Sequence, residues 1–195
     1  MPVIRANKCD MERNILAQLI DWQNKTNRKP LILNGARQVG KTYILKEFGR
    51  TQYKNIAYVN CDNNDVVTKI FSRDYDIRRI ILSLSAVTHV SIKPGETLII
   101  LDEIQENPLA LNSLKYFCEN APEYHVAVAG SLLGISLHGD TSFPVGKVDV
   151  IKMFPMTFDE FLMAIGEKQL ADILRTRDFN VIDTFASKLT DCLRQ

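Results

Sequence analysis

Residues Gly35–Thr42 read GARQVGKT, and the apolar run Leu31–Leu33 comes shortly before them. This order fits the pattern G-x-x-x-x-G-K-[ST], in which backbone N–H groups converge on a phosphate. Gly35 and Gly40 lack a Cβ, so the loop can curl tightly and approach the phosphate oxygens closely. A strand before the loop and a helix after it complete the expected context, because a helix N-terminus favours negative charge. The sequence therefore predicts a phosphate-binding loop.

The residues of this loop have separate expected roles. Lys41 can reach the β- and γ-phosphates of a nucleotide and is a predicted catalytic residue, and the hydroxyl of Thr42 can ligate Mg²⁺. The predicted nucleotide contacts are Gly35, Ala36, Arg37, Gln38, Val39, Gly40, Lys41, Thr42 and Tyr43.

A second motif, TLIILDE, occupies Thr97–Glu103. An apolar strand that ends in an acid places Asp102 at the carboxyl edge of the sheet, beside the phosphate loop, where it can hold Mg²⁺ through water. Glu103 follows directly, and a carboxylate in that place can polarise an attacking water as a general base. The sequence predicts Asp102 with Thr42 as the metal site and Glu103 as the catalytic base.

A third segment, VAVAGS, ends another buried strand in a small polar residue, Ser131. The hydroxyl of Ser131 is expected at the same edge of the sheet, where it can sense a γ-phosphate or orient a water molecule. Ser131 is therefore the third predicted catalytic residue, although a hydroxyl at a strand end is common without such a role.

Apolar periodicity predicts the fold class. Five short apolar runs indicate strands at Leu31–Asn34, Ile56–Asn60, Thr97–Asp102, His125–Gly130 and Val148–Lys152. Helical spacing indicates helices at Asp10–Lys25, with Asp10 as N-cap, and at Lys41–Phe48, Asp76–Val87 and Pro108–Asn120. This alternation predicts an α/β three-layer sandwich, in which a five-stranded parallel sheet is covered by helices on both faces.

Three segments are predicted along the chain: an N-terminal helix and linker over 1–30, a nucleotide-binding core over 31–153, and helices over 154–195. Thr157 and Glu160 form a capping-box pattern at the start of the last segment. An apolar stripe at helical spacing then comprises Phe179, Ile182, Phe185, Leu189 and Leu193. Because the stripe has no stop signal, two expectations stay open: it packs on its own domain, or it leads into a further domain or contacts another subunit.

Composition argues against several other functions. A net charge of +1 over 195 residues gives no reason to expect general binding to nucleic acid or to an anionic membrane, and leaves only a local patch open. Four scattered cysteines and three scattered histidines indicate neither a disulfide framework nor a metal site. No apolar run approaches the roughly 18 residues of a membrane span, and no signal peptide is recognised. We expect a soluble, cytoplasmic protein.

Four segments in order, GARQVGKT, LIILDEIQ, AVAGSLLG and FPMTFDEFL, resemble the AAA-type ATPase domain found in many bacterial and archaeal proteins. The resemblance implies that Gly35–Thr42 bind ATP, that Asp102 and Thr42 serve Mg²⁺, that Glu103 activates water and that Ser131 is the sensor. ATP and Mg²⁺ are therefore the expected ligands, and ATP hydrolysis that drives or gates a conformational change is the expected function.

The same resemblance carries further expectations. The strand that ends before Ser131 should lie between the strand of the phosphate loop and the strand of Asp102, as in the glutamate-activating ATPases. Such domains usually precede a winged-helix or nuclease-like domain, so the expected partners are that domain or a second subunit. Where relatives usually carry Gly-Arg, this chain reads Val145-Gly-Lys147. Lysine keeps the charge but lacks the planar fork, which weakens the case for an arginine-finger role at Lys147.

Three alternatives stay open. A module that binds ATP without hydrolysing it, and so gates a neighbouring domain, fits the same motifs. A P-loop small-molecule kinase would need an arginine-rich lid, and the Arg73, Arg78 and Arg79 cluster fits a solvated helix face better. The third alternative is a GTPase, because Asn7–Asp10 match N-K-x-D, the guanine-binding pattern of that class. This stretch, however, precedes the phosphate loop, and Asp102–Gln105 do not match the D-x-x-G pattern that GTPases carry.

Overall fold

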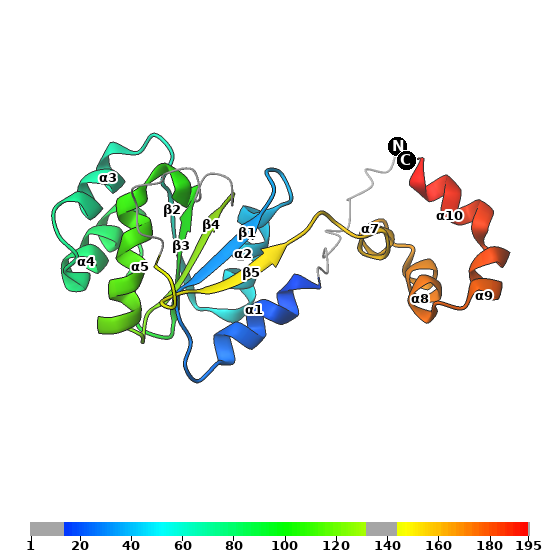
Figure 1. Cartoon of the computed structure of the whole chain (residues 1–195), viewed down its shortest axis with the longest axis horizontal. Helices are drawn as coiled ribbons and strands as arrows, with labels where there is room; N and C mark the ends of the chain where they lie inside the picture. The colour runs from blue at the N-terminus through cyan, green and yellow to red at the C-terminus, as the bar shows by residue number, and fades with distance from the viewer. Residues whose placement is uncertain (1–13, 132–143, 195) are drawn as a thin grey trace, which may run out of the picture. The chain divides into compact units, whose positions relative to one another are not determined.

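A five-stranded parallel sheet forms the centre of the larger unit of the chain, residues 15–154 (Figure 1). The computed structural model describes residues 14–131 and 144–194. The strands are β1 (Leu31–Gly35), β2 (Asn55–Asn60), β3 (Thr97–Asp102), β4 (His125–Gly130) and β5 (Asp149–Met153). Their order across the sheet is β2-β3-β4-β1-β5. The predicted α/β fold is confirmed, including the insertion of β4 between β1 and β3, and no strand boundary differs from its prediction by more than one residue.

Helices cover both faces of the sheet. On one face lie α1 (Ile15–Asn24) and α2 (Lys41–Gln52), and on the other lie α3 (Asp65–Ser72), α4 (Ile77–Thr88) and α5 (Pro108–Asn120). A short 3₁₀ turn, η1 (Ile104–Glu106), joins β3 to α5. The connections therefore make three layers, helix, sheet and helix, as expected for parallel strands that are buried on both faces.

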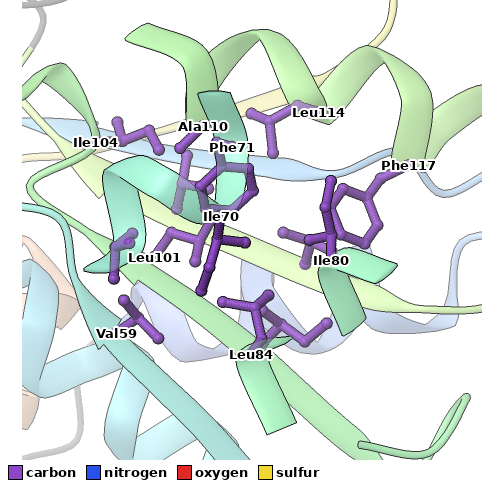
Figure 2. Packing of buried hydrophobic residues seen from close by; sticks show 14 of the residues in the cluster. Val59, Ile70, Phe71, Ile80, Leu84, Leu101, Ile104, Ala110, Leu114 and Phe117 are labelled. Carbon is purple, nitrogen blue, oxygen red and sulfur yellow. The ribbon is translucent and has the colours of Figure 1, made fainter. Parts of the chain in front are cut away.

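The strands owe their continuous apolar runs to this burial. In β3, Leu98 and Ile100 pack in the cluster under α1 and α2, whereas Ile99 and Leu101 pack in the cluster under α3, α4 and α5. Successive side chains of a strand point to opposite faces, so both sets must be apolar when both faces are covered. Figure 2 shows the second cluster, in which Leu101 lies among side chains that α3, α4 and α5 contribute.

The helices differ from the predictions in three places. Helix α3 was not predicted, because its eight residues carry only a short apolar face; Asn64 begins it, as its side chain accepts a hydrogen bond from the Val67 N–H. Helix α2 extends beyond Phe48 to Gln52, where the chain turns toward the edge strand β2. Helix α1 begins at Ile15, and the predicted N-cap Asp10 lies outside the described residues.

The contacts divide the chain into two compact units. One covers residues 15–154, and the other combines Asn14 with the described residues from Pro155 onward. The second unit contains α7 (Phe158–Ala164), α8 (Lys168–Thr176), α9 (Phe179–Thr184) and α10 (Ala186–Leu193). The predicted capping box at Thr157 and Glu160 is present, with the Thr157 N–H donating to Glu160 Oε2 over 3.0 Å. Among the described residues, no helix is long and apolar enough to cross a membrane.

The predicted C-terminal stripe is not one continuous helical face. The chain leaves helical geometry at Phe185, where φ is −106° and ψ is 10°, and this break separates α9 from α10. Leu189 packs with Leu162 in the core of the second unit, whereas Phe179 is 82% exposed and Leu193 is 65% exposed. A break in the helix redirects the side chains that follow it, so equal spacing in sequence no longer places them on one face.

Candidate functional site

The path of the loop between β1 and α2 requires glycine at two positions, Gly35 and Gly40. Gly40 lies at φ +92° directly before α2, a region that side chains other than glycine rarely adopt. Gly35 has a different reason from the one predicted. A Cβ there would lie 2.4 Å from the carbonyl oxygen of Met153, so Gly35 allows β5 to approach β1. Gln38 also adopts a positive φ, 64°, which completes the tight curl of the loop.

The first turn of α2 is built to receive an anion. No side chain caps this end of the helix, so its first N–H groups face the loop. The ammonium of Lys41 donates to the carbonyl oxygens of Gly35, at 2.9 Å, and Ala36, at 2.7 Å, which holds it across the loop. Partial burial lowers the pKa of Lys41, and the nearby carboxylates of Glu103 and Asp102 oppose that shift. The ammonium of Lys41 is thus held at the loop by backbone acceptors, close to the uncapped end of α2, where its charge can pair with a phosphate.

Asp102, at the end of β3, is buried at 4% exposure and joins three elements. Its Oδ2 accepts hydrogen bonds from the hydroxyl of Thr42 on α2, at 2.7 Å, and from the hydroxyl of Tyr58 on β2, at 3.0 Å. Burial, followed by the charge of Asp102, raises the pKa of Tyr58 to about 12, so this phenol stays a donor. A hydroxyl beside a carboxylate is an oxygen donor set that suits Mg²⁺, which usually takes one or two carboxylates together with phosphates and waters.

Glu103 does not continue the strand. Its backbone is left-handed, with φ 50° and ψ 47°, and its N–H donates to Asp102 Oδ1 over 3.1 Å. Because β3 ends at Asp102, the turn at Glu103, and not the alternation of a strand, sets the direction of the Glu103 side chain. The side-chain amide of Gln105, on η1, donates to Glu103 Oε2 over 2.5 Å. Asp102 and Glu103 are thus held by different partners.

A cavity of about 680 Å³ lies where these elements meet. It is lined by Arg37, Gln38, Gly40, Lys41, Thr42, Tyr43, Asn60, Asp62, Glu103, Glu106 and Ser131. The structure thus brings the loop, the proposed base and the proposed sensor to one cavity at the carboxyl edge of the sheet. Asp102 reaches it through Thr42, whereas Val39 packs against the apolar core.

Three lining residues were not predicted, namely Asn60, Asp62 and Glu106. Asn60 could have been found from the sequence, because it ends the predicted strand Ile56–Asn60 and the carboxyl ends of parallel strands meet at one edge. Asp62 and Glu106 lie in turns whose paths the sequence pattern does not define.

Lys147, the residue considered for an arginine-finger role, does not line this cavity. Lys147 pairs with Glu119 near the end of α5, at 2.8 Å, and this ion pair raises the pKa of Lys147. Because α5 runs back toward the amino edge of the sheet, Lys147 lies on the opposite side from the phosphate loop of its own chain. The N-K-x-D stretch, Asn7–Asp10, lies outside the described residues.

The strand order, the loop before α2 and the adjacent carboxylates of Asp102 and Glu103 at the end of β3 define the class: this is a P-loop NTPase fold of the glutamate-activating branch. A comparison with protein families matches residues 27–162 to the family described as an AAA domain. The match spans more than half of the chain, so the chain belongs to this AAA-domain family. Proteins of the family are P-loop ATPases, which in general bind ATP together with Mg²⁺.

Solved structures with a similar fold include the Orc1 protein of Aeropyrum pernix in complex with DNA and Cdc6p of Pyrobaculum aerophilum, each at 16% identity, with TM-scores of 0.49 and 0.48. The region aligned with the Orc1 protein covers 79% of this chain and 48% of that protein's chain, and the region aligned with Cdc6p covers 81% and 53%. The Pif1 helicase of Candida albicans matches at 11% identity and TM-score 0.43, covering 95% of this chain and 47% of its own. This chain therefore spans about half the length of these structures. A search of the curated proteins found no match.

Proposed function

We propose that this chain binds ATP with Mg²⁺ in the cavity beside Gly35–Thr42 and hydrolyses it. The observation that carries the proposal is the convergence of the Lys41 cation, an uncapped helix N-terminus and the Glu103 carboxylate on one cavity, with Asp102 hydrogen-bonded to the lining residue Thr42. In this assignment, the N–H groups of the loop and of the first turn of α2 bind the phosphates, and Lys41 neutralises the β- and γ-phosphates. Thr42 and Asp102 would hold Mg²⁺, which neutralises charge on the phosphates when it is bound.

The proposed chemistry assigns one role to each remaining group. The carboxylate of Glu103 accepts a proton from a water molecule, and the oxygen of that water forms a bond to the γ-phosphorus. The bond from the γ-phosphorus to the bridging oxygen breaks, and ADP leaves with the electron pair. Ser131, which lines the same cavity, is proposed to contact the γ-phosphate or the water.

Replacing Glu103 by Gln tests the chemistry, because Gln keeps the size and the hydrogen bonds of Glu but does not accept the proton. We expect ATP affinity to stay within a few-fold and phosphate release to fall by about 10² to 10⁴-fold, the usual contribution of a general base. The matched control is Glu123→Gln, an exposed residue in the turn before β4. Hydrolysis by Glu103→Gln at the wild-type rate would remove Glu103 from the role of base.

The main rival is an ATP-gated module without turnover. It predicts ATP binding by the wild-type chain and no phosphate release under any condition, which the same measurements distinguish. A kinase predicts transfer of the γ-phosphate to an added acceptor in preference to water. Arg79, which a kinase lid would need, is engaged instead: it donates to Asp74 and to the carbonyl oxygen of Ile70 at the junction of α3 and α4.

We further propose that turnover acts on an attached domain or on a second subunit. In the second unit, Phe179 and Leu193 are largely exposed apolar side chains, which suit a protein contact. Sedimentation of the chain with and without ATP tests this, with Phe179→Ser expected to weaken any association. The control is Val66→Ser, another exposed apolar position, on α3. A monomer at all concentrations would limit the proposal to an attached domain.

A further inference from the structure

The turn between β3 and α5 holds Glu103 under constraint. A positive φ of 50° is uncommon for a residue with a long side chain, and it persists only where the surroundings fix it. The N–H of Glu103 is bonded to Asp102 Oδ1, and the carbonyl oxygen of Glu103 accepts from the Glu106 N–H over 3.0 Å. The backbone on both sides of the proposed base is thus fixed, which leaves its side chain as the part that needs a partner.

That partner is Gln105, whose amide Nε2 lies 2.5 Å from Glu103 Oε2. An ionised carboxylate only accepts hydrogen bonds, so the amide must turn its N–H₂ toward Glu103 and its Oε1 away. Gln105 is buried at 4% exposure, and its Oε1 is a buried acceptor with no hydrogen-bond partner among the described residues. The N–H₂ group of the amide therefore has a hydrogen-bond partner in Glu103, whereas its oxygen has none.

An unsatisfied buried acceptor destabilises a fold, and an apolar side chain of the same length would avoid that penalty. Stability therefore does not explain a glutamine at this position. Glu103 lines the cavity and Gln105 does not, so the amide holds the carboxylate from the protein side. The bond engages Oε2 and leaves Oε1 of Glu103 as the oxygen that accepts the proton.

We infer that Gln105 is a positioning residue that fixes the carboxylate of Glu103 for ATP hydrolysis, an inference that rests on the proposed function. Without the amide, the side chain of Glu103 is free to sample other rotamers, and only a fraction of them face the attacking water. ATP binding does not need this orientation of Glu103, because the loop and Lys41 supply the contacts to the phosphates. The loss therefore falls on kcat and not on KM.

The test compares the whole chain with Gln105→Met, which keeps the length of the side chain and removes the donor. We expect kcat to fall by roughly ten-fold or more, a part of the general-base contribution, while KM and ATP affinity stay within about two-fold. The melting temperature should stay equal or rise, because the unsatisfied oxygen is gone. The matched control is Asn112→Leu on α5, which also removes a buried unpartnered amide oxygen but lies away from the cavity. Its kcat should not change.

A double-mutant cycle separates positioning from a general effect. If Gln105 acts only through Glu103, then Glu103→Gln with Gln105→Met should release phosphate at the rate of Glu103→Gln alone. An unchanged or raised kcat in Gln105→Met would overturn the inference. The inference would also fail if Gln105→Met slowed the Glu103→Gln variant by the same factor by which it slows the wild-type chain. A lower melting temperature in both Gln105→Met and Gln105→Leu would also overturn it, since the amide would then be structural. A wild-type chain that binds ATP without turnover would instead overturn the proposed hydrolysis, and this inference with it.

Discussion

The hydroxyl of Thr42 donates a 2.7 Å hydrogen bond to the carboxylate of Asp102, and the two residues are 60 positions apart in the chain. The bond joins the first turn of α2 to the last residue of β3, although β4 lies between β1 and β3 in the sheet. Tyr58 donates to the same carboxylate oxygen from β2. The proposed metal site is therefore fixed by three elements, and the predictions below follow from the groups that hold it.

Lys41→Ala should abolish measurable ATP binding. The ammonium is the cation of the loop, and its removal leaves phosphate charge unpaired, which we expect to weaken affinity by about 100-fold or more. Calorimetry with ATP and with GTP measures both the loss and the choice of base. Lys54→Ala is the control, because Lys54 is exposed and pairs with Glu96. Unchanged binding in Lys41→Ala, or tight binding of GTP in preference to ATP, would contradict the assignment.

Asp102→Asn should weaken binding of ATP in the presence of Mg²⁺ more than in its absence, because the site loses the carboxylate charge. Thr42→Val removes the partner hydroxyl, and the two substitutions should be strongly non-additive, since both disrupt one hydrogen-bonded pair. Mg²⁺ titrations of nucleotide binding by the two single variants and the double variant measure this. Equal losses with and without Mg²⁺ would remove Asp102 from the metal site.

Tyr58→Phe removes one donor to Asp102 and keeps the ring that lies under Lys46. We expect the free energy of unfolding to fall by about 1 to 3 kcal/mol, because the hydrogen bond is made to a charged group. The apparent Mg²⁺ affinity should fall a few-fold, since Asp102 loses part of its orientation. Denaturant unfolding and Mg²⁺ titration measure the two effects. Tyr124→Phe is the control, and equal effects in both variants would remove the special role of Tyr58.

His125, the first residue of β4, should make the fold sensitive to acid. It is buried beside the hydroxyl of Tyr53, which lies 2.7 Å from His125 Nδ1. Burial, and then the charge of Arg28, lowers the pKa of His125 to about 4 from 6.5. Below pH 6.5 the imidazole of His125 is protonated in the unfolded chain, whereas in the folded chain it stays neutral down to about pH 4. The free energy of unfolding should therefore fall as the pH falls through this window.

The expected loss from His125 is roughly 1 to 3 kcal/mol between these two pH values. Urea unfolding at a series of pH values measures it. His125→Asn, which keeps an acceptor near the Nδ1 position, should flatten the pH dependence. The control is His89→Asn, at the end of α4, where asparagine tolerates the left-handed backbone. The same acid sensitivity in His125→Asn as in the wild-type chain would assign the effect to other groups.

Much of the fold was determined by the sequence itself. The apolar run of β3 requires burial on both faces, and GARQVGKT requires a loop between a strand and a helix, so the sheet and its phosphate loop follow from local pattern. The helix Pro108–Asn120 was predicted to the residue, because proline marks its first turn. The predicted residues Lys41, Thr42 and Glu103 line one cavity for the same reason, since strand ends meet at one edge.

Only the tertiary structure decided the contacts between elements. Spacing in the sequence does not reveal that Tyr58 donates to Asp102, because that pair depends on the register of β2 against β3. The left-handed turn at Glu103, which brings Gln105 to its carboxylate, depends on how β3 passes into α5. The helix break at Phe185 divides the C-terminal stripe, and Leu189, beyond the break, packs in the core of the second unit. Periodicity records which residues are buried, whereas partners and side-chain directions are set by long-range packing that a local pattern does not encode.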